Sequence, residues 1–221
     1  MSYELWALAH ILVIAYWLGT DLAVYYLSGA IVDDNKPTSV RVYAAKAMLL
    51  LDMVPRTALI LTLLTGLGLA TSVWLPRPAL GWWWLWPALL AWLALTWAVF
   101  RLEHSPLGIL LARIDFGLRI LIIAALLIMT LALLLGWGQF AVLPWLAAKL
   151  GIMALIMFLG LIIRVQLKPF GPLFARVAPG NSDPATERKL KRLIRQVKIP
   201  VWVIWISLVI AAAMGKLQPG L

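Results

Sequence analysis

Residues 117–137 read GLRILIIAALLIMTLALLLGW, a run of 21 residues in which Arg119 is the single charged side chain. A helix needs about 20 mainly apolar residues to cross the hydrocarbon core of a bilayer. Five other stretches have the same character, so the sequence predicts six membrane-spanning helices, at 5–31, 53–75, 82–101, 117–137, 142–164 and 199–215. The apolar runs are continuous rather than alternating, which argues against a transmembrane β-barrel. The predicted fold is an all-α, polytopic membrane helix bundle in one transmembrane domain, 1–221.

The composition agrees with this fold class. Of the 221 residues, 64% are apolar and 13% are charged, against about 45–50% and about 25% in soluble domains. Cysteine is absent, which excludes disulfides, iron–sulfur clusters and thiolate metal ligands. The two histidines, His10 and His104, are therefore the main candidate nitrogen ligands.

The basic residues lie almost entirely on one side of the predicted topology. The segments 32–52, 102–116 and 165–198 and the helix ends beside them carry sixteen of the nineteen Lys and Arg residues; the other side carries Arg77, Lys149 and Lys216. Excess positive charge marks cytoplasmic loops. We therefore expect both termini outside, a basic cytoplasmic loop or helix at 178–198, and a bacterial-type inner membrane location. The net charge of +10 then reflects topology rather than a nucleic-acid partner.

An internal repeat appears at an offset of 63 residues. It relates the hairpins 53–101 and 117–164, and its matched positions include Asp52 with Asp115, Arg56 with Arg119, Trp74 with Trp137, and Arg101 with Arg164. The sequence predicts two copies of one hairpin in the same orientation. Parallel repeats of this kind occur in transporters.

Three carboxylates near the membrane need partners. Asp52–Arg56 and Asp115–Arg119 are spaced i, i+4, which predicts two ion pairs within helices. Asp21 lies inside the first span, where a carboxylate is costly unless paired. It could form an ion pair with Arg56 or Arg119, or act as a proton relay or substrate contact. Asp21 and Arg56 are the candidate catalytic residues.

His10 and Lys149 share a depth in the predicted outer leaflet. Each lies six or seven residues inside its span, which is roughly 9–11 Å at 1.5 Å per residue. The lysine could instead extend its amine to the interface, and the histidine could be an ordinary core residue. Two nitrogen bases at one level could also ligate one metal from opposite sides, provided that the amine is unprotonated. Met153 and Met157 follow Lys149 on the same helix face and offer a softer ligand.

Four short motifs carry a resemblance to a known family: Leu5-Trp6-x3-His10-x6-Trp17-x-Gly19, Pro55 with LILTLLTGL at 59–67, Trp145-Leu146-x2-Lys149-Leu150, and Ile199-Pro200. Their order resembles that of the HemJ-type protoporphyrinogen oxidases, which belong with the CopD family to one superfamily of small membrane proteins. The family has about four helices, whereas this chain carries an additional hairpin. The resemblance implies haem b as cofactor, with His10 and Lys149 as the residues tied to haem binding and activity.

Three functions compete. The first is a haem b-binding membrane oxidoreductase, acting on a porphyrinogen or passing electrons to a redox partner, with His10 as one axial ligand and Lys149 or Met153 as the other. Arg and Lys at the helix ends would then hold the propionates. The second is a small-molecule or metal transporter. The third is a non-catalytic accessory subunit of a larger membrane complex. Substrate and oligomeric state stay open.

Overall fold

The structure is a computed structural model that describes residues 2–73, 75, 83–137, 142–180 and 182–217. Over these residues the backbone forms eight helices and no strand, so the prediction of an all-α fold is confirmed. The helices are α1 (Tyr3–Ile31), α2 (Thr38–Leu51), α3 (Met53–Val73), α4 (Leu85–Arg101), α5 (Pro106–Leu135), α6 (Pro144–Gln166), α7 (Phe170–Val177) and α8 (Pro184–Leu217).

Five helical segments of the described chain are long and apolar enough to cross a membrane. They are α1, the stretch Thr38–Val73 that contains α2 and α3, α5, α6 and α8. α4 is also apolar but has 17 residues. Large apolar side chains on the outside, such as Tyr26, Leu121 and Ile199, are 78%, 66% and 68% exposed, as expected for a surface that faces lipid. The protein is a multi-pass membrane helix bundle.

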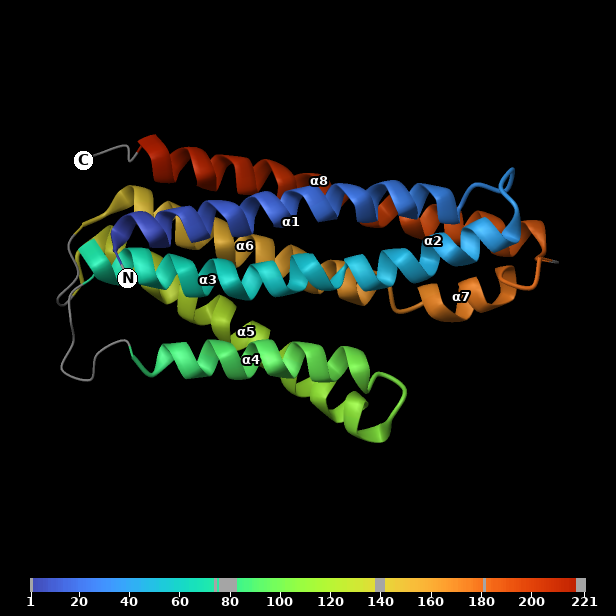
Figure 1. The fold of residues 1–221 in the computed structure, drawn as a ribbon, viewed down its shortest axis with the longest axis horizontal. Helices are drawn as coiled ribbons and strands as arrows, with labels where there is room; N and C mark the ends of the chain where they lie inside the picture. Colours follow the sequence, from blue (N-terminus) through green and yellow to red (C-terminus); the bar gives the residue numbers. More distant parts are fainter. Residues whose placement is uncertain (1, 74, 76–82, 138–141, 181, 218–221) are drawn as a thin grey trace.

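The long helices lie side by side, and α1 begins at the same end of the bundle at which α8 finishes (Figure 1). We call this end the terminal end and the opposite end the α7 end. α1 packs against α3, α6 packs against α5 and α8, and α4 packs against α3 and α5. α3 and α5 run toward the terminal end, whereas α4 and α6 run away from it (Figure 1). The central core joins buried side chains from five helices, α1, α3, α4, α6 and α8, among them Trp17, Ile60, Trp92 and Met157.

The segments that connect the predicted spans are largely helical. The segment 32–52 contains α2, the segment 102–116 contains the start of α5, and the segment 165–198 contains α7 and the first half of α8. The basic stretch before Lys198 continues into the last span as one helix, with Pro200 inside it. A search for continuous apolar runs does not detect these helices, because they are amphipathic. α2, for example, buries Ala44, Ala45 and Met48 on one face.

The α7 end has a core of its own, made by α1, α2, α7 and α8 around Ile31, Val177 and Leu190. The buried Arg41 side chain joins these helices. Its Nε donates to the Ile31 carbonyl at the end of α1 (2.8 Å), and its two terminal nitrogens donate to the Glu187 carboxylate of α8 (3.0 and 2.7 Å). The 34 residues of α8 span about 51 Å, against a hydrocarbon core of about 30 Å. α8 is therefore longer than a span of the hydrocarbon core requires.

Candidate functional site

The terminal half of the bundle encloses a cavity of about 470 Å³, which we call the His10 cavity. Its walls come from α1, α3, α4, α5, α6 and α8 and are mostly aliphatic. The three candidate ligands named from the sequence, His10, Lys149 and Met153, all line it. The structure thus brings these three residues together at one cavity.

His10 presents one ring nitrogen to a protein partner and leaves the other free. Its Nδ1 lies 2.7 Å from the hydroxyl oxygen of Thr65 on α3. The same hydroxyl lies 2.7 Å from the Leu61 carbonyl and 3.3 Å from the Thr62 carbonyl. When it donates its proton to one of these carbonyls, it accepts from the Nδ1–H of His10, and Nε2 then carries the lone pair. Histidines that bind metals commonly donate their second ring N–H in this way.

Two glycines allow the candidate ligands to lie close to neighbouring helices. A Cβ at Gly66 would lie 3.4 Å from Cε1 of His10, so the imidazole packs directly on α3. A Cβ at Gly215 would lie 2.5 Å from Nζ of Lys149, so the amine rests against the α8 backbone where any side chain would displace it. Within the described part of the chain Lys149 forms no ion pair. Met153 lies one turn further along α6 and is 8% exposed.

This donor set suits a metal macrocycle better than a bare metal ion. Among the described residues no group of three or more His, Cys, Asp or Glu side chains could hold a metal. A haem needs only axial ligands from the protein, and His10 with Lys149 or Met153 could supply them. Trp84 and Trp145 also line the cavity and add flat apolar surface. The residues of the His10 cavity fit haem b.

The described lining of the His10 cavity holds few cations that could bind propionates. Lys149 is the single cation in that lining, which contains no arginine. Arg77, the one arginine predicted on this side, lies outside the described residues. The other arginines stand near the opposite ends of the helices, which is the same asymmetry that produced the predicted topology.

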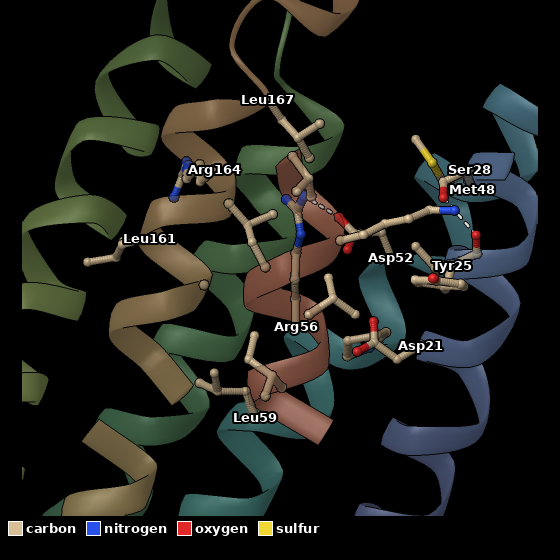
Figure 2. A pocket seen from close by; sticks show the side chains of 18 of the residues that line it. Asp21, Tyr25, Ser28, Met48, Asp52, Arg56, Leu59, Leu161, Arg164 and Leu167 are labelled. Carbon is tan, nitrogen blue, oxygen red and sulfur yellow. Dashed lines mark hydrogen bonds and ion pairs between the residues drawn. The ribbon is translucent and has the colours of Figure 1, made fainter. Parts of the chain in front are cut away.

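A second cavity of about 360 Å³ lies toward the α7 end, and we call it the arginine cavity (Figure 2). It is lined by five cationic side chains and two carboxylates: Arg56, Arg119, Arg164, Lys168, Lys198, Asp21 and Asp52. The two candidate catalytic residues, Asp21 and Arg56, thus lie together, but in a different cavity from His10.

Asp21 has a different partner from the one expected. Its carboxylate accepts a hydrogen bond from Nε1 of Trp205 on α8, at 2.8 Å. The predicted ion pair with Arg56 or Arg119 is wrong, because each arginine binds an aspartate one turn earlier on its own helix. Two residues four positions apart are brought into contact by the helix itself, whereas an ion pair with Asp21 would depend on how a second helix packs.

The two predicted i, i+4 ion pairs are confirmed, but their surroundings differ. Arg56 binds Asp52, and these side chains are 41% and 31% exposed. Asp115 is 2% exposed and accepts three hydrogen bonds: from Nε of Arg119 (3.0 Å), Nη1 of Arg164 (2.6 Å) and Nε1 of Trp92 (2.9 Å). Asp115 therefore joins α4, α5 and α6, whereas Asp52 has one partner on its own chain segment.

Sequence reasoning missed Thr65, Trp92 and Trp205 as partners of the charged and ligating residues. The chain has 13 tryptophans, and neither tryptophan nor threonine by its residue type indicates the partner of a charged or ligating group. Arg164 did stand out as the repeat match of Arg101, but Arg101 is exposed and lines neither cavity. His104 is also exposed and lies beside Glu103, at 3.5 Å, away from both cavities.

Comparisons with protein-family profiles, with curated proteins and with solved structures found no match to this chain.

Proposed function

We propose that this chain is a haem b-binding membrane protein that holds the haem in the His10 cavity and acts in redox chemistry. The observation that supports this most is the hydrogen bond between His10 Nδ1 and the Thr65 hydroxyl, which occupies Nδ1 and leaves Nε2 as the ring nitrogen for a ligand at the wall of an apolar cavity. The HemJ-type resemblance implies the same histidine and Lys149. Haem would supply one-electron transfer at the terminal end of the bundle.

Each residue of the cavity has a distinct task in this proposal. His10 would hold the haem iron through Nε2, and Thr65 would orient the imidazole ring. Lys149, when unprotonated, or Met153 would also hold the iron. The aliphatic walls exclude water and so protect the iron centre from side reactions. Asp21 and Arg56 line the arginine cavity, so the proposal assigns them no catalytic role at the haem.

The proposal includes a topology of six spans with both termini outside, in a bacterial-type cytoplasmic membrane. α4 has 17 residues and a length of about 26 Å, and a short span of this size is tolerated by local thinning of the bilayer. The positive-inside rule supports the orientation. The shared directions of α3 with α5 and of α4 with α6 support a tandem repeat of the two hairpins.

The test of haem binding is the visible spectrum of the purified full-length protein. We expect a Soret band that His10→Ala removes almost completely. His104→Ala is the matched control, because it deletes the other, exposed histidine, and should leave the band unchanged. Wild-type protein without a Soret band, or a His10→Ala variant that keeps it, would contradict the proposal. The chain would then be better understood as an accessory subunit of a membrane complex or as a transporter.

The topology can be tested on the same chain because it contains no cysteine. Single cysteines at Ser2 and at the exposed Lys189 report the two sides of the membrane. A membrane-impermeant maleimide added to intact cells should label Ser2→Cys and not Lys189→Cys. Labelling of Lys189→Cys from outside would reverse the proposed orientation.

A further inference from the structure

The arginine cavity carries more positive charge than its own carboxylates compensate. Five cations line it, and the carboxylates that face them are Asp21 and Asp52 in the lining and Asp115, which binds two of the arginines. The cluster thus has a formal excess of two positive charges. Uncompensated charge inside a membrane bundle is costly. A bound anion would lower that cost.

Several N–H donors on the cavity wall are still available for such an anion. Arg56 donates one N–H to Asp52 and Arg164 donates one to Asp115, while a guanidinium has five. These two side chains enter the cavity from α3 and α6 (Figure 2) and are 41% and 29% exposed. Lys168, at the end of α6, forms no ion pair within the described residues. The donors are therefore both unused and accessible.

The remainder of the cavity is apolar. Its inner wall includes Trp17, Leu59, Ile156 and Ile204, which belong to the central core or pack against it. A free, fully hydrated anion would gain nothing from these contacts. An amphiphile would place its anionic head at the arginines and its hydrocarbon chain against this wall. In the proposed topology, the cavity also lies in the cytoplasmic half of the bundle.

We propose that the arginine cavity binds a phosphate-bearing amphiphile, such as an anionic phospholipid, independently of the His10 cavity. Arg56 and Arg164 bind the phosphate oxygens from two helices, and Lys168 and Lys198 add positive charge nearby. The planar guanidinium matches phosphate geometry and can bind it with two parallel hydrogen bonds. Basic pockets between membrane helices on the cytoplasmic side are typical sites for anionic head groups.

The test is a binding titration of the full-length protein in neutral detergent with three probes: phosphatidylglycerol, phosphatidylcholine and inorganic phosphate. Phosphatidylglycerol should bind most tightly. Arg164→Gln should weaken its binding by about tenfold or more, since a hydrogen bond to a charged group is lost. Arg101→Gln is the matched control, because it removes the repeat-equivalent arginine that is exposed and outside the cavity.

The outcomes separate the possible sources of the anion. Equal binding of phosphatidylcholine, or equal weakening by Arg101→Gln, would show general lipid association and overturn the proposal. Inorganic phosphate that binds as tightly as phosphatidylglycerol would show that the hydrocarbon chains of the lipid contribute nothing to binding. That result would also overturn the proposal. Lys168→Gln removes no ion pair and should keep the fold. It should weaken phosphatidylglycerol binding by about two- to threefold, an effect typical of an exposed charge; unchanged binding in both Lys168→Gln and Arg56→Gln contradicts the site.

Discussion

The two cavities of this bundle use polar side chains in opposite ways. In the His10 cavity, one imidazole and one amine stand in an aliphatic wall, and no carboxylate occurs in its described lining. In the arginine cavity, cations and carboxylates bind one another through short contacts on α3, α5 and α6. The first arrangement keeps neutral lone pairs for a ligand. The second creates an excess of donors that favours an anion.

The difference follows from the position of each cavity along the bundle. Arginines and lysines concentrate at the α7 end, where they can reach both the bilayer interface and the carboxylates of facing helices. At the terminal end the helices carry few charges, so a buried base such as His10 binds a hydroxyl instead. Each variant below should therefore affect one cavity and leave the other unchanged.

The largest expected effect is on stability at the arginine cavity. Asp115→Asn removes the shared counter-charge of Arg119 and Arg164, and breaking such a buried pair typically costs about 3–5 kcal/mol. Asp52→Asn removes the matching but half-exposed pair with Arg56 and should cost about 0–1 kcal/mol. Unfolding of the two variants in detergent measures the difference, and folded Asp115→Asn protein should keep its Soret band. Equal costs for the two aspartates would mean that Asp115 does not join the helices energetically.

The next effect is on the ligand at the His10 cavity. Thr65→Val removes the acceptor of the imidazole proton at nearly constant volume, and the loss of such a support typically lowers metal affinity about 10–100-fold. Thr62→Val is the control, because Thr62 lines the same cavity and its hydroxyl has no hydrogen-bond partner in the described structure. Haem titration of both variants measures the change. A loss of affinity in Thr62→Val as large as that in Thr65→Val would show a general effect of packing.

The helices that the sequence predicted are those that contain a long, continuous run of apolar residues. Continuous apolar runs located five helical segments that are long and apolar enough to cross a membrane, because a span requires about 20 such residues in a row. α2 and α7 escaped prediction because their helices bury only one face and gain stability from α1 and α8. A search for continuous apolar runs does not detect such amphipathic helices, and their stability depends on packing at the α7 end.

The candidate sites show the same limit. The pairs Asp52–Arg56 and Asp115–Arg119 were predictable because both partners lie on one helix with fixed spacing. Asp21 was assigned to an arginine from depth alone, but its partner is an indole on α8. Depth gives one coordinate of a side chain, while the rotation of each helix about its axis decides which neighbours meet. That rotation comes from interhelical packing.

A smaller effect is expected at the second axial ligand. Lys149→Ala should alter the Soret band but retain most of the haem, because Met153 or water can take the vacated position. Since only the unprotonated amine binds a metal, acidification should shift the wild-type spectrum before haem is lost, and this step should be absent from Lys149→Ala. Gly215→Ala, which moves Nζ of Lys149 without removing it, should give an intermediate spectrum. Loss of haem in Lys149→Ala as complete as in His10→Ala would mean that Met153 is no substitute.

The smallest effect concerns an exposed ion pair. Its contribution to stability is the reference against which that of the ion pairs at the arginine cavity is compared. The Lys191 amine donates to both oxygens of Asp34, at 2.7 Å, and this bond holds the pKa of the Asp34 carboxyl below its usual range. A lowered pKa in the folded state stabilises the fold above the ordinary value of about 4. This contribution disappears as the pH falls through the lower, folded-state pKa.

Because both side chains are about half exposed, water and salt screen the pair. Asp34→Asn should therefore lower the Tm at pH 7 only slightly, and by less still at pH 3 or in high salt. A loss comparable to that of Asp115→Asn would mean that charge at the surface matters as much as charge in the arginine cavity, and the contrast between the two would fail.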